Sequence, residues 1–96
     1  MTDVRGIVQM KAFALVVFDA THSVQESGGL GAASGGRREF VPVLAGAALA
    51  AGADALFIET HPNPDAAKSD AACQWPLDQL EPLLEKCLRI FEAARL

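Results

Sequence analysis

The sequence has 96 residues, enough for one small domain at most, and such a domain buries only about 60% of the surface that its unfolded chain exposes. Hydrophobic residues make up 51% of it, which argues against a disordered chain. The net charge of −4 argues against a nucleic-acid partner, because nucleic-acid binding needs a basic patch.

The N-terminal residues are not typical of a signal peptide, because Thr2, Asp3 and Arg5 interrupt any apolar run. Every apolar stretch is shorter than the ~20 residues that a membrane helix needs. Cys73 and Cys87 lie far apart and form no C-x-x-C pair. We therefore expect a cytoplasmic protein with free thiols and no membrane partner.

The first two predicted elements precede residue 20. Residues 4–13 are compatible with a brief helix that contains Ile7 and Met10 and ends near Phe13. Residues 15–18, with the sequence LVVF, are apolar without alternation, which is typical of a strand buried on both faces. The chain then turns polar at Asp19.

The next segment, residues 26–36, reads ESGGLGAASGG and holds five glycines. Such a segment cannot sustain a helix or a strand, so it is predicted to be a long loop. It lacks G-x-x-x-x-G-K-[ST], which excludes a P-loop. Two interpretations remain open: an unstructured connection, or a lid that closes over a substrate.

A helix is predicted over residues 39–51, with an apolar stripe formed by Phe40, Val43, Leu44, Ala47, Ala48 and Ala51. Arg37 and Arg38 precede the apolar part of this helix. They are interpreted either as solvated or as acting near the helix N-terminus. Residues 55–58, ALFI, form a second buried-strand run that ends in Glu59, Thr60 and His61.

The last predicted helix covers residues 77–94, and Pro82 moves its expected start towards Leu80. Its predicted apolar face consists of Leu77, Leu80, Leu84, Cys87, Leu88 and Phe91. Trp75, just before it, is interpreted as a packing residue.

Strands thus alternate with helices, an order that predicts a parallel sheet in an α/β fold. Two parallel strands alone would leave unpaired edges and an exposed apolar face. A (β/α)₈ barrel takes about 250 residues. We therefore expect residues 1–96 to be a partial TIM-barrel domain, the C-terminal part of a (β/α)₈ barrel with roughly its last two βα units.

Polar side chains follow both predicted strands: Asp19 and His22 after the first, Glu59 and His61 after the second. The carboxyl ends of parallel strands line active sites in such folds. Together with Asp70 in the next loop, an imidazole and two carboxylates could bind a divalent metal or act in acid–base catalysis. They could equally cap helices and turns. His61, beside Pro62, is more typical of a turn.

Longer motifs carry a family resemblance. The stretches DATHSVQ, SGG-x-REFVPVL, ETHP-x-P and SD, continuing through WPLDQLEPLLE, closely resemble 3-deoxy-D-manno-octulosonate 8-phosphate synthase over nearly the whole chain. The resemblance implies a (β/α)₈ barrel that is usually tetrameric. It also implies condensation of phosphoenolpyruvate with the sugar phosphate D-arabinose 5-phosphate, release of inorganic phosphate, and a product used in lipopolysaccharide synthesis.

The resemblance places His22 at the reaction centre and Gln25 near the substrates. It implies that Asp19 lies at the substrate site and that Ser34, Gly35 and Gly36 belong to a loop closing over it. In metal-dependent members, the residues matching His22, Glu59 and Asp70, with a cysteine from an earlier part of the chain, hold a divalent metal.

The metal class is left open by this sequence. Metal-independent members of the resembled family have an asparagine in place of the metal-binding cysteine, and that position precedes the present sequence. Ala71, directly after Ser69-Asp70, resembles some metal-dependent members, where the family often has glycine.

Two alternatives are kept. The related 3-deoxy-D-arabino-heptulosonate 7-phosphate synthase shares the ETHP-like and SD-like elements but typically has a DPSHG-type strand end. A non-catalytic remnant, or a module that docks on a complete homologue, is the second alternative. The resembled enzymes bind both phosphates with lysines and arginines from earlier strands, so we expect the isolated chain to be inactive.

Overall fold

The computed structural model describes residues 3–26, 35–68 and 71–96. Its main α-helices are α1 (Arg5–Lys11), α2 (Val41–Ala50) and α3 (Leu80–Ala94). The strands are β1 (Val17–Asp19), β2 (Gln25–Glu26), β3 (Gly35–Gly36), β4 (Ala55–Phe57), β5 (Thr60–His61) and β6 (Trp75–Pro76). Single 3₁₀ turns are η1 (His22–Val24), η2 (Arg38–Phe40), η3 (Pro64–Ala66), η4 (Ala71–Cys73) and η5 (Leu77–Gln79).

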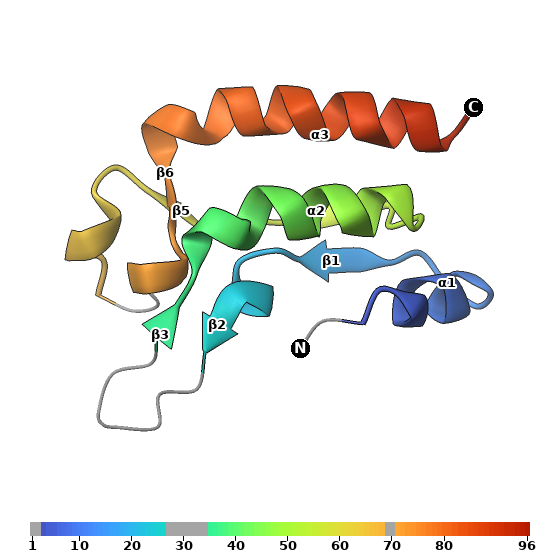
Figure 1. Ribbon diagram of the computed structural model, residues 1–96, viewed down its shortest axis with the longest axis horizontal. Coiled ribbons are helices and arrows are strands. Elements are labelled where there is room, and N and C mark those ends of the chain that lie inside the picture. Colours follow the sequence, from blue (N-terminus) through green and yellow to red (C-terminus); the bar gives the residue numbers. More distant parts are fainter. Residues whose placement is uncertain (1–2, 27–34, 69–70) are drawn as a thin grey trace.

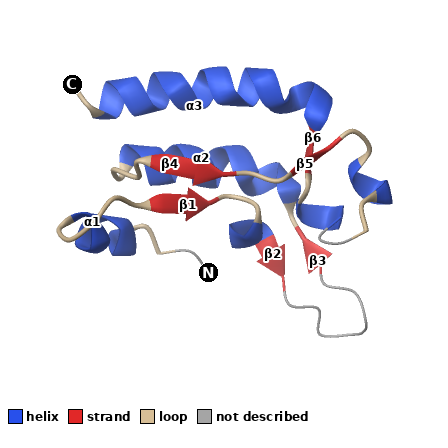
Figure 2. Cartoon of the chain, turned by 180° about the vertical axis from the view of Figure 1, so that it is seen from behind, coloured by secondary structure: helices blue, strands red, loops and turns tan. Residues whose placement is uncertain are grey.

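The centre of the fold is a βαβ unit formed by β1, α2 and β4. Strands β1 and β4 pair in parallel, with Val17 opposite Ala55 and Asp19 opposite Phe57. Helix α2 lies along this sheet and α3 runs beside α2 (Figure 1), while Figure 2 shows the two strands from the other side. The mixed α/β fold and the parallel pairing confirm the sequence prediction.

Only one face of the β1–β4 sheet is covered. Val16 is buried, and Phe18 and Leu56 pack against the core. On the other face, Val17 is 65% exposed and Phe57 is 47% exposed. The prediction that the strands are buried on both faces is therefore wrong for the described residues, because the helices pack against one face only.

Helix α2 ends in a Schellman motif. Gly52 adopts a φ of 112°, its N–H donates to Leu49 O at 3.1 Å, and the N–H of Ala53 donates to Ala48 O at 3.0 Å. Glycine fits here because the left-handed region is costly for residues with a Cβ. At the other end, Pro42 lies in the first turn, where its missing N–H is harmless.

The predicted apolar stripe of α2 is confirmed at Ala48, which is buried, and at Leu44 and Ala51, which pack against the core. It is wrong at Phe40, which is 47% exposed, and at Val43, which is 65% exposed. The buried positions are Val41, Ala45, Gly46, Ala48 and Leu49. Since every residue of α2 is apolar or glycine, the sequence pattern could not select a face. Packing against the sheet and α3 selects it.

Helix α3 begins at Leu80, as the position of Pro82 predicts. It buries Leu83 and Cys87, whereas Leu84 and Leu88 of the predicted face are exposed. Cys73 is also buried, and neither cysteine is in a disulfide, in agreement with the predicted free thiols. None of the helices in the described ranges is long and apolar enough to cross a membrane.

The two ends of the glycine-rich segment form a short antiparallel ladder. Gln25 pairs with Gly36, and Glu26 pairs with Gly35. The prediction that residues 26–36 contain no strand is therefore wrong at both ends of the segment. Residues 27–34 lie outside the described part.

Asp54 connects the elements at the entry to the strands. Its Oδ1 accepts from Lys11 Nζ at 2.7 Å and from Arg95 Nη2 at 3.4 Å, while Oδ2 accepts from the Val16 N–H at 2.8 Å. The Arg95 guanidinium also stacks over the Phe91 ring at 3.8 Å. Asp54 thus links α1, the start of β1 and the end of α3, at the opposite end of the strands from Asp19.

Candidate active site

His22 lies in the turn after β1 and is oriented by Asp19, the last residue of that strand. Asp19 Oδ1 accepts from the His22 backbone N–H at 2.9 Å, and Asp19 Oδ2 lies 2.7 Å from His22 Nδ1. An ionised carboxylate only accepts hydrogen bonds, so this contact places a hydrogen on Nδ1. In the neutral ring, Nε2 is then the nitrogen with the lone pair, suited to bind a metal or accept a proton.

Glu59 follows β4 by two residues and is held at three points. Its N–H donates to Thr21 Oγ1 at 2.6 Å, and its carbonyl oxygen accepts from the Trp75 N–H at 3.0 Å. Its Oε1 accepts from Gln74 Nε2 at 2.8 Å. The Glu59 backbone and carboxylate are therefore fixed by residues from two other loops.

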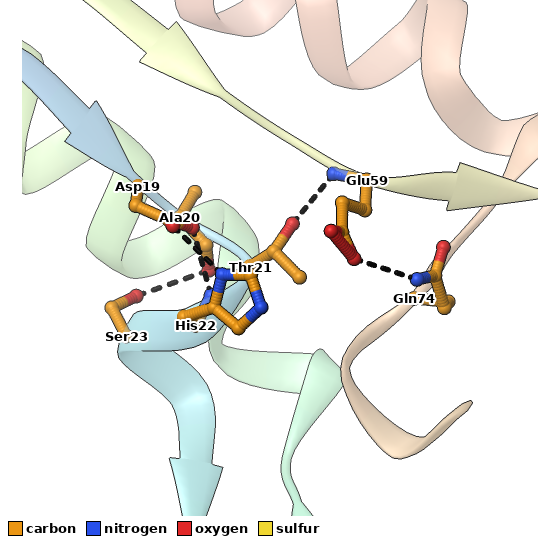
Figure 3. A network of polar contacts seen from close by, with 7 residues as sticks. All are labelled: Asp19, Ala20, Thr21, His22, Ser23, Glu59 and Gln74. Atoms are coloured by element: carbon orange, nitrogen blue, oxygen red, sulfur yellow. Dashed lines mark hydrogen bonds and ion pairs between the residues drawn. The ribbon is translucent and has the colours of Figure 1, made fainter. Parts of the chain in front are cut away.

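Parallel pairing brings these two groups to the same end of the sheet. Figure 3 shows Thr21 between His22 and Glu59, with the Glu59 carboxylate directed towards Gln74. The His22 ring also stacks on Phe57 of β4, with 6.4 Å between centroids and 23° between planes. The imidazole and one of the carboxylates that the sequence placed at the strand ends thus lie at the same end of the sheet.

The loop after β5 is tied to the start of α2 by Arg38. Its Nη2 donates to Ala71 O at 2.7 Å and pairs with Asp65 Oδ1 at 3.0 Å. The interpretation of Arg38 as simply solvated is therefore wrong: it lies in η2, just before α2, and its guanidinium binds the loop after β5.

The residues predicted to lie near the substrates or to close over them are Gln25, Ser34, Gly35 and Gly36. Gln25 is exposed and belongs to the β2–β3 ladder with Gly35 and Gly36. A Cβ at Gly36 would overlap the Cys73 sulfur, so close packing alone already requires glycine there. Ser34 and Asp70 lie outside the described residues.

A metal centre is not complete within the described ranges, where no three His, Cys, Asp or Glu side chains gather. His22 and Glu59 are suitable donors for a divalent ion, while Asp70 is outside these ranges. His61 is the last residue of β5, and its Nδ1 accepts from the Asn63 N–H in the following turn at 2.9 Å. His61 also lines a polar pocket together with Glu59, Lys68 and Gln74.

Sequence reasoning missed Thr21 and Gln74. Thr21 has no exposed surface and Gln74 is 8% exposed, and buried polar groups of this kind are held in hydrogen bonds. The position of Thr21, between the end of β1 and His22, could have suggested a structural role. No local pattern in the sequence distinguishes Gln74.

An imidazole oriented by a carboxylate and a second carboxylate lie at the carboxyl end of parallel strands, the end at which barrel enzymes place their active sites. The comparison with known families specifies the class. A model described as the DAHP synthetase I family matches residues 1–94. The chain belongs to this family.

Several curated relatives carry the name 2-dehydro-3-deoxyphosphooctonate aldolase. The Hydrogenovibrio crunogenus protein is 51% identical, with 99% of this chain and 35% of the relative covered. The Alkalilimnicola ehrlichii protein is 53% identical, with the same coverage. The Thioalkalivibrio sulfidiphilus protein is 58% identical, covering 88% of this chain and 30% of the relative. The chain thus spans about a third of their length.

Proposed function

We propose that this chain provides the His22–Glu59 part of the active site of a 3-deoxy-8-phosphooctulonate synthase. The reaction would condense phosphoenolpyruvate with D-arabinose 5-phosphate and release inorganic phosphate. Identity of 51–58% to proteins named 2-dehydro-3-deoxyphosphooctonate aldolase is the observation that carries this proposal. The two side chains at neighbouring strand ends supply suitable chemistry.

In the proposed reaction, the vinyl carbon of phosphoenolpyruvate attacks the sugar aldehyde, and a cationic centre develops at C2. Water adds to C2, and phosphate then leaves by cleavage of the C–O bond. The Asp19-oriented imidazole of His22 would orient or deprotonate this water. Gln25, Ser34, Gly35 and Gly36 would line the substrate side of the site.

A divalent metal is part of the proposal. His22, Glu59 and Asp70 would hold it, since imidazole and carboxylate ligands suit a divalent first-row ion. When bound, such an ion stabilises negative charge on oxygen and acidifies water. The hydrogen on Nδ1 directs Nε2 of His22 to the ligand role, and Gln74 presents the Glu59 carboxylate.

The surrounding architecture is proposed from the fold. One face of the sheet, with Val17 and Phe57, is uncovered, and the β1–β4 pair has two outer edges. Parallel sheets are normally covered on both faces, so we propose that residues 1–96 are part of a (β/α)₈ barrel. In that setting, the protein would be a homo-oligomer, a tetramer, acting in cytoplasmic lipopolysaccharide synthesis.

A chimera tests the proposal. Residues 1–96 would replace the matched third of the Hydrogenovibrio crunogenus relative, and product formation from both substrates would be measured. We expect turnover by the chimera and none by the isolated chain. His22→Ala should abolish turnover, whereas Gln9→Ala, at an exposed position on α1, should preserve it. A folded chimera that is inactive, or one indifferent to His22→Ala, would refute the proposal.

The same chimera tests the metal. Treatment with a chelator should remove activity, and a divalent cation should restore it. Full activity in chelator would show that the reaction needs no metal and would leave the His22 role to acid–base chemistry.

A second candidate is 3-deoxy-D-arabino-heptulosonate 7-phosphate synthesis, because the family description names DAHP synthetase. Replacing arabinose 5-phosphate by erythrose 4-phosphate in the assay distinguishes the two. Preference for erythrose 4-phosphate would favour this second candidate.

A further inference from the structure

We propose that Thr21 and Gln74 are positioning residues that hold the Glu59 carboxylate in one orientation relative to His22. The role of that carboxylate in a reaction rests on the proposed function. The contacts that hold it are independent of any reaction and form a Thr21–Glu59–Gln74 network (Figure 3).

Thr21 extends the β1–β4 pairing beyond the last backbone contact. The Ala20 N–H donates to Phe57 O at 2.9 Å, and the next link is made by a side chain, Thr21 Oγ1, which accepts from the Glu59 N–H at 2.6 Å. Thr21 is fully buried and directly precedes His22. This hydrogen bond therefore fixes the Glu59 backbone to the residue next to the imidazole.

Gln74 controls the other end of the Glu59 side chain. Its amide donates to Oε1 at 2.8 Å, and hydrogen bonds to an ionised carboxylate are stronger than bonds between neutral groups. The Trp75 N–H holds the Glu59 carbonyl at 3.0 Å, so the loop that carries Gln74 is itself tied to Glu59.

The network occupies Oε1 and leaves Oε2 for another ligand. Among the described residues, no hydrogen bond to Oε2 is formed. Glutamate has many rotamers, and fixing one of them before a ligand arrives reduces the ordering required on binding. Gln74 thus acts through Glu59 and need not contact the substrate.

Matched variants separate positioning from general stability. Gln74→Met keeps the side-chain length but removes the donor, and Gln9→Met makes the same change at an exposed position on α1. Thr21→Val keeps the shape and removes the acceptor, while Thr21→Ser keeps the hydroxyl. Side-chain couplings of Glu59, measured by NMR on the 96-residue chain and on the chimera, report its rotamers.

We expect one Glu59 rotamer in the unmodified chain and the Gln9→Met variant, and averaging in Gln74→Met. In the chimera, kcat should fall about tenfold or more for Gln74→Met and Thr21→Val, since each loses a hydrogen bond to Glu59. Thr21→Ser should retain most activity. These rates are compared well below the unfolding temperature of each variant.

A single Glu59 rotamer in Gln74→Met would overturn the positioning role, whatever the kinetics. Rotamer averaging with unchanged kcat would leave the orientation by Gln74 intact and instead refute the use of Glu59 in the reaction. A Glu59→Gln chimera with normal turnover would point to that same failure, so the two proposals fail separately.

Discussion

Gly46, in the middle of α2, allows two opposing effects on stability to be compared. Glycine in a helix interior is about 0.8–1.0 kcal/mol less favourable than alanine. However, a Cβ at this position would lie 3.0 Å from Ile90 Cδ1 of α3. The Ile90 side chain would have to shift by a few tenths of an ångström, and a χ angle displaced by about 30° costs roughly 0.5–1.5 kcal/mol.

The two effects nearly cancel in Gly46→Ala. We expect its free energy of unfolding to differ from that of the unmodified chain by less than about 0.7 kcal/mol, given these propensity and rotamer costs. In an Ile90→Val background the Cδ1 atom is absent, so the same change should stabilise by about 1 kcal/mol. This corresponds to a rise in Tm of about 4–8 °C for a domain of this size.

Urea and thermal unfolding, followed by circular dichroism at the helix band, measure all four members of this cycle. The coupling between positions 46 and 90 should be about 0.5–1.5 kcal/mol, the cost of moving Ile90. Equal effects of Gly46→Ala in both backgrounds would refute the reasoning, because the contact with Ile90 would then play no part.

Two further predictions concern Asp54 and Gly36. The hydrogen bond from Lys11, and after it the one from the Val16 N–H, hold the pKa of Asp54 below its ordinary value. Ionised Asp54 therefore stabilises the fold above its unfolded-state pKa of about 3.9, and this stabilisation is lost as the pH falls below that value. Asp54→Asn should lower Tm at neutral pH and weaken the fall of Tm below about pH 4, and a variant whose Tm follows the original curve would contradict this. Gly36→Ala should destabilise by about 1–3 kcal/mol through overlap with Cys73, and Cys73→Ala in the same chain should recover much of the loss. Gly6→Ala, with open space around the new Cβ, is the control, and equal unfolding curves for Gly36→Ala and Gly6→Ala would contradict the overlap.

The sequence by itself determined the type and order of the main elements, because these depend on local signals. Apolar runs at residues 15–18 and 55–58 gave strands, and the position of Pro82 set the start of α3. Polar residues directly after each strand predicted a site at one edge of the sheet. Parallel pairing of β1 with β4 puts these residues at the same edge.

Only the tertiary structure decided which faces are buried and which residues complete the site. Helix α2 is apolar or glycine throughout, so its sequence does not distinguish a buried face from an exposed one. Packing against the neighbouring elements determines which face is buried. The partners of Glu59 lie 38 residues before it, at Thr21, and 15 residues after it, at Gln74. Such contacts arise when loops meet in space, and no local sequence pattern encodes them.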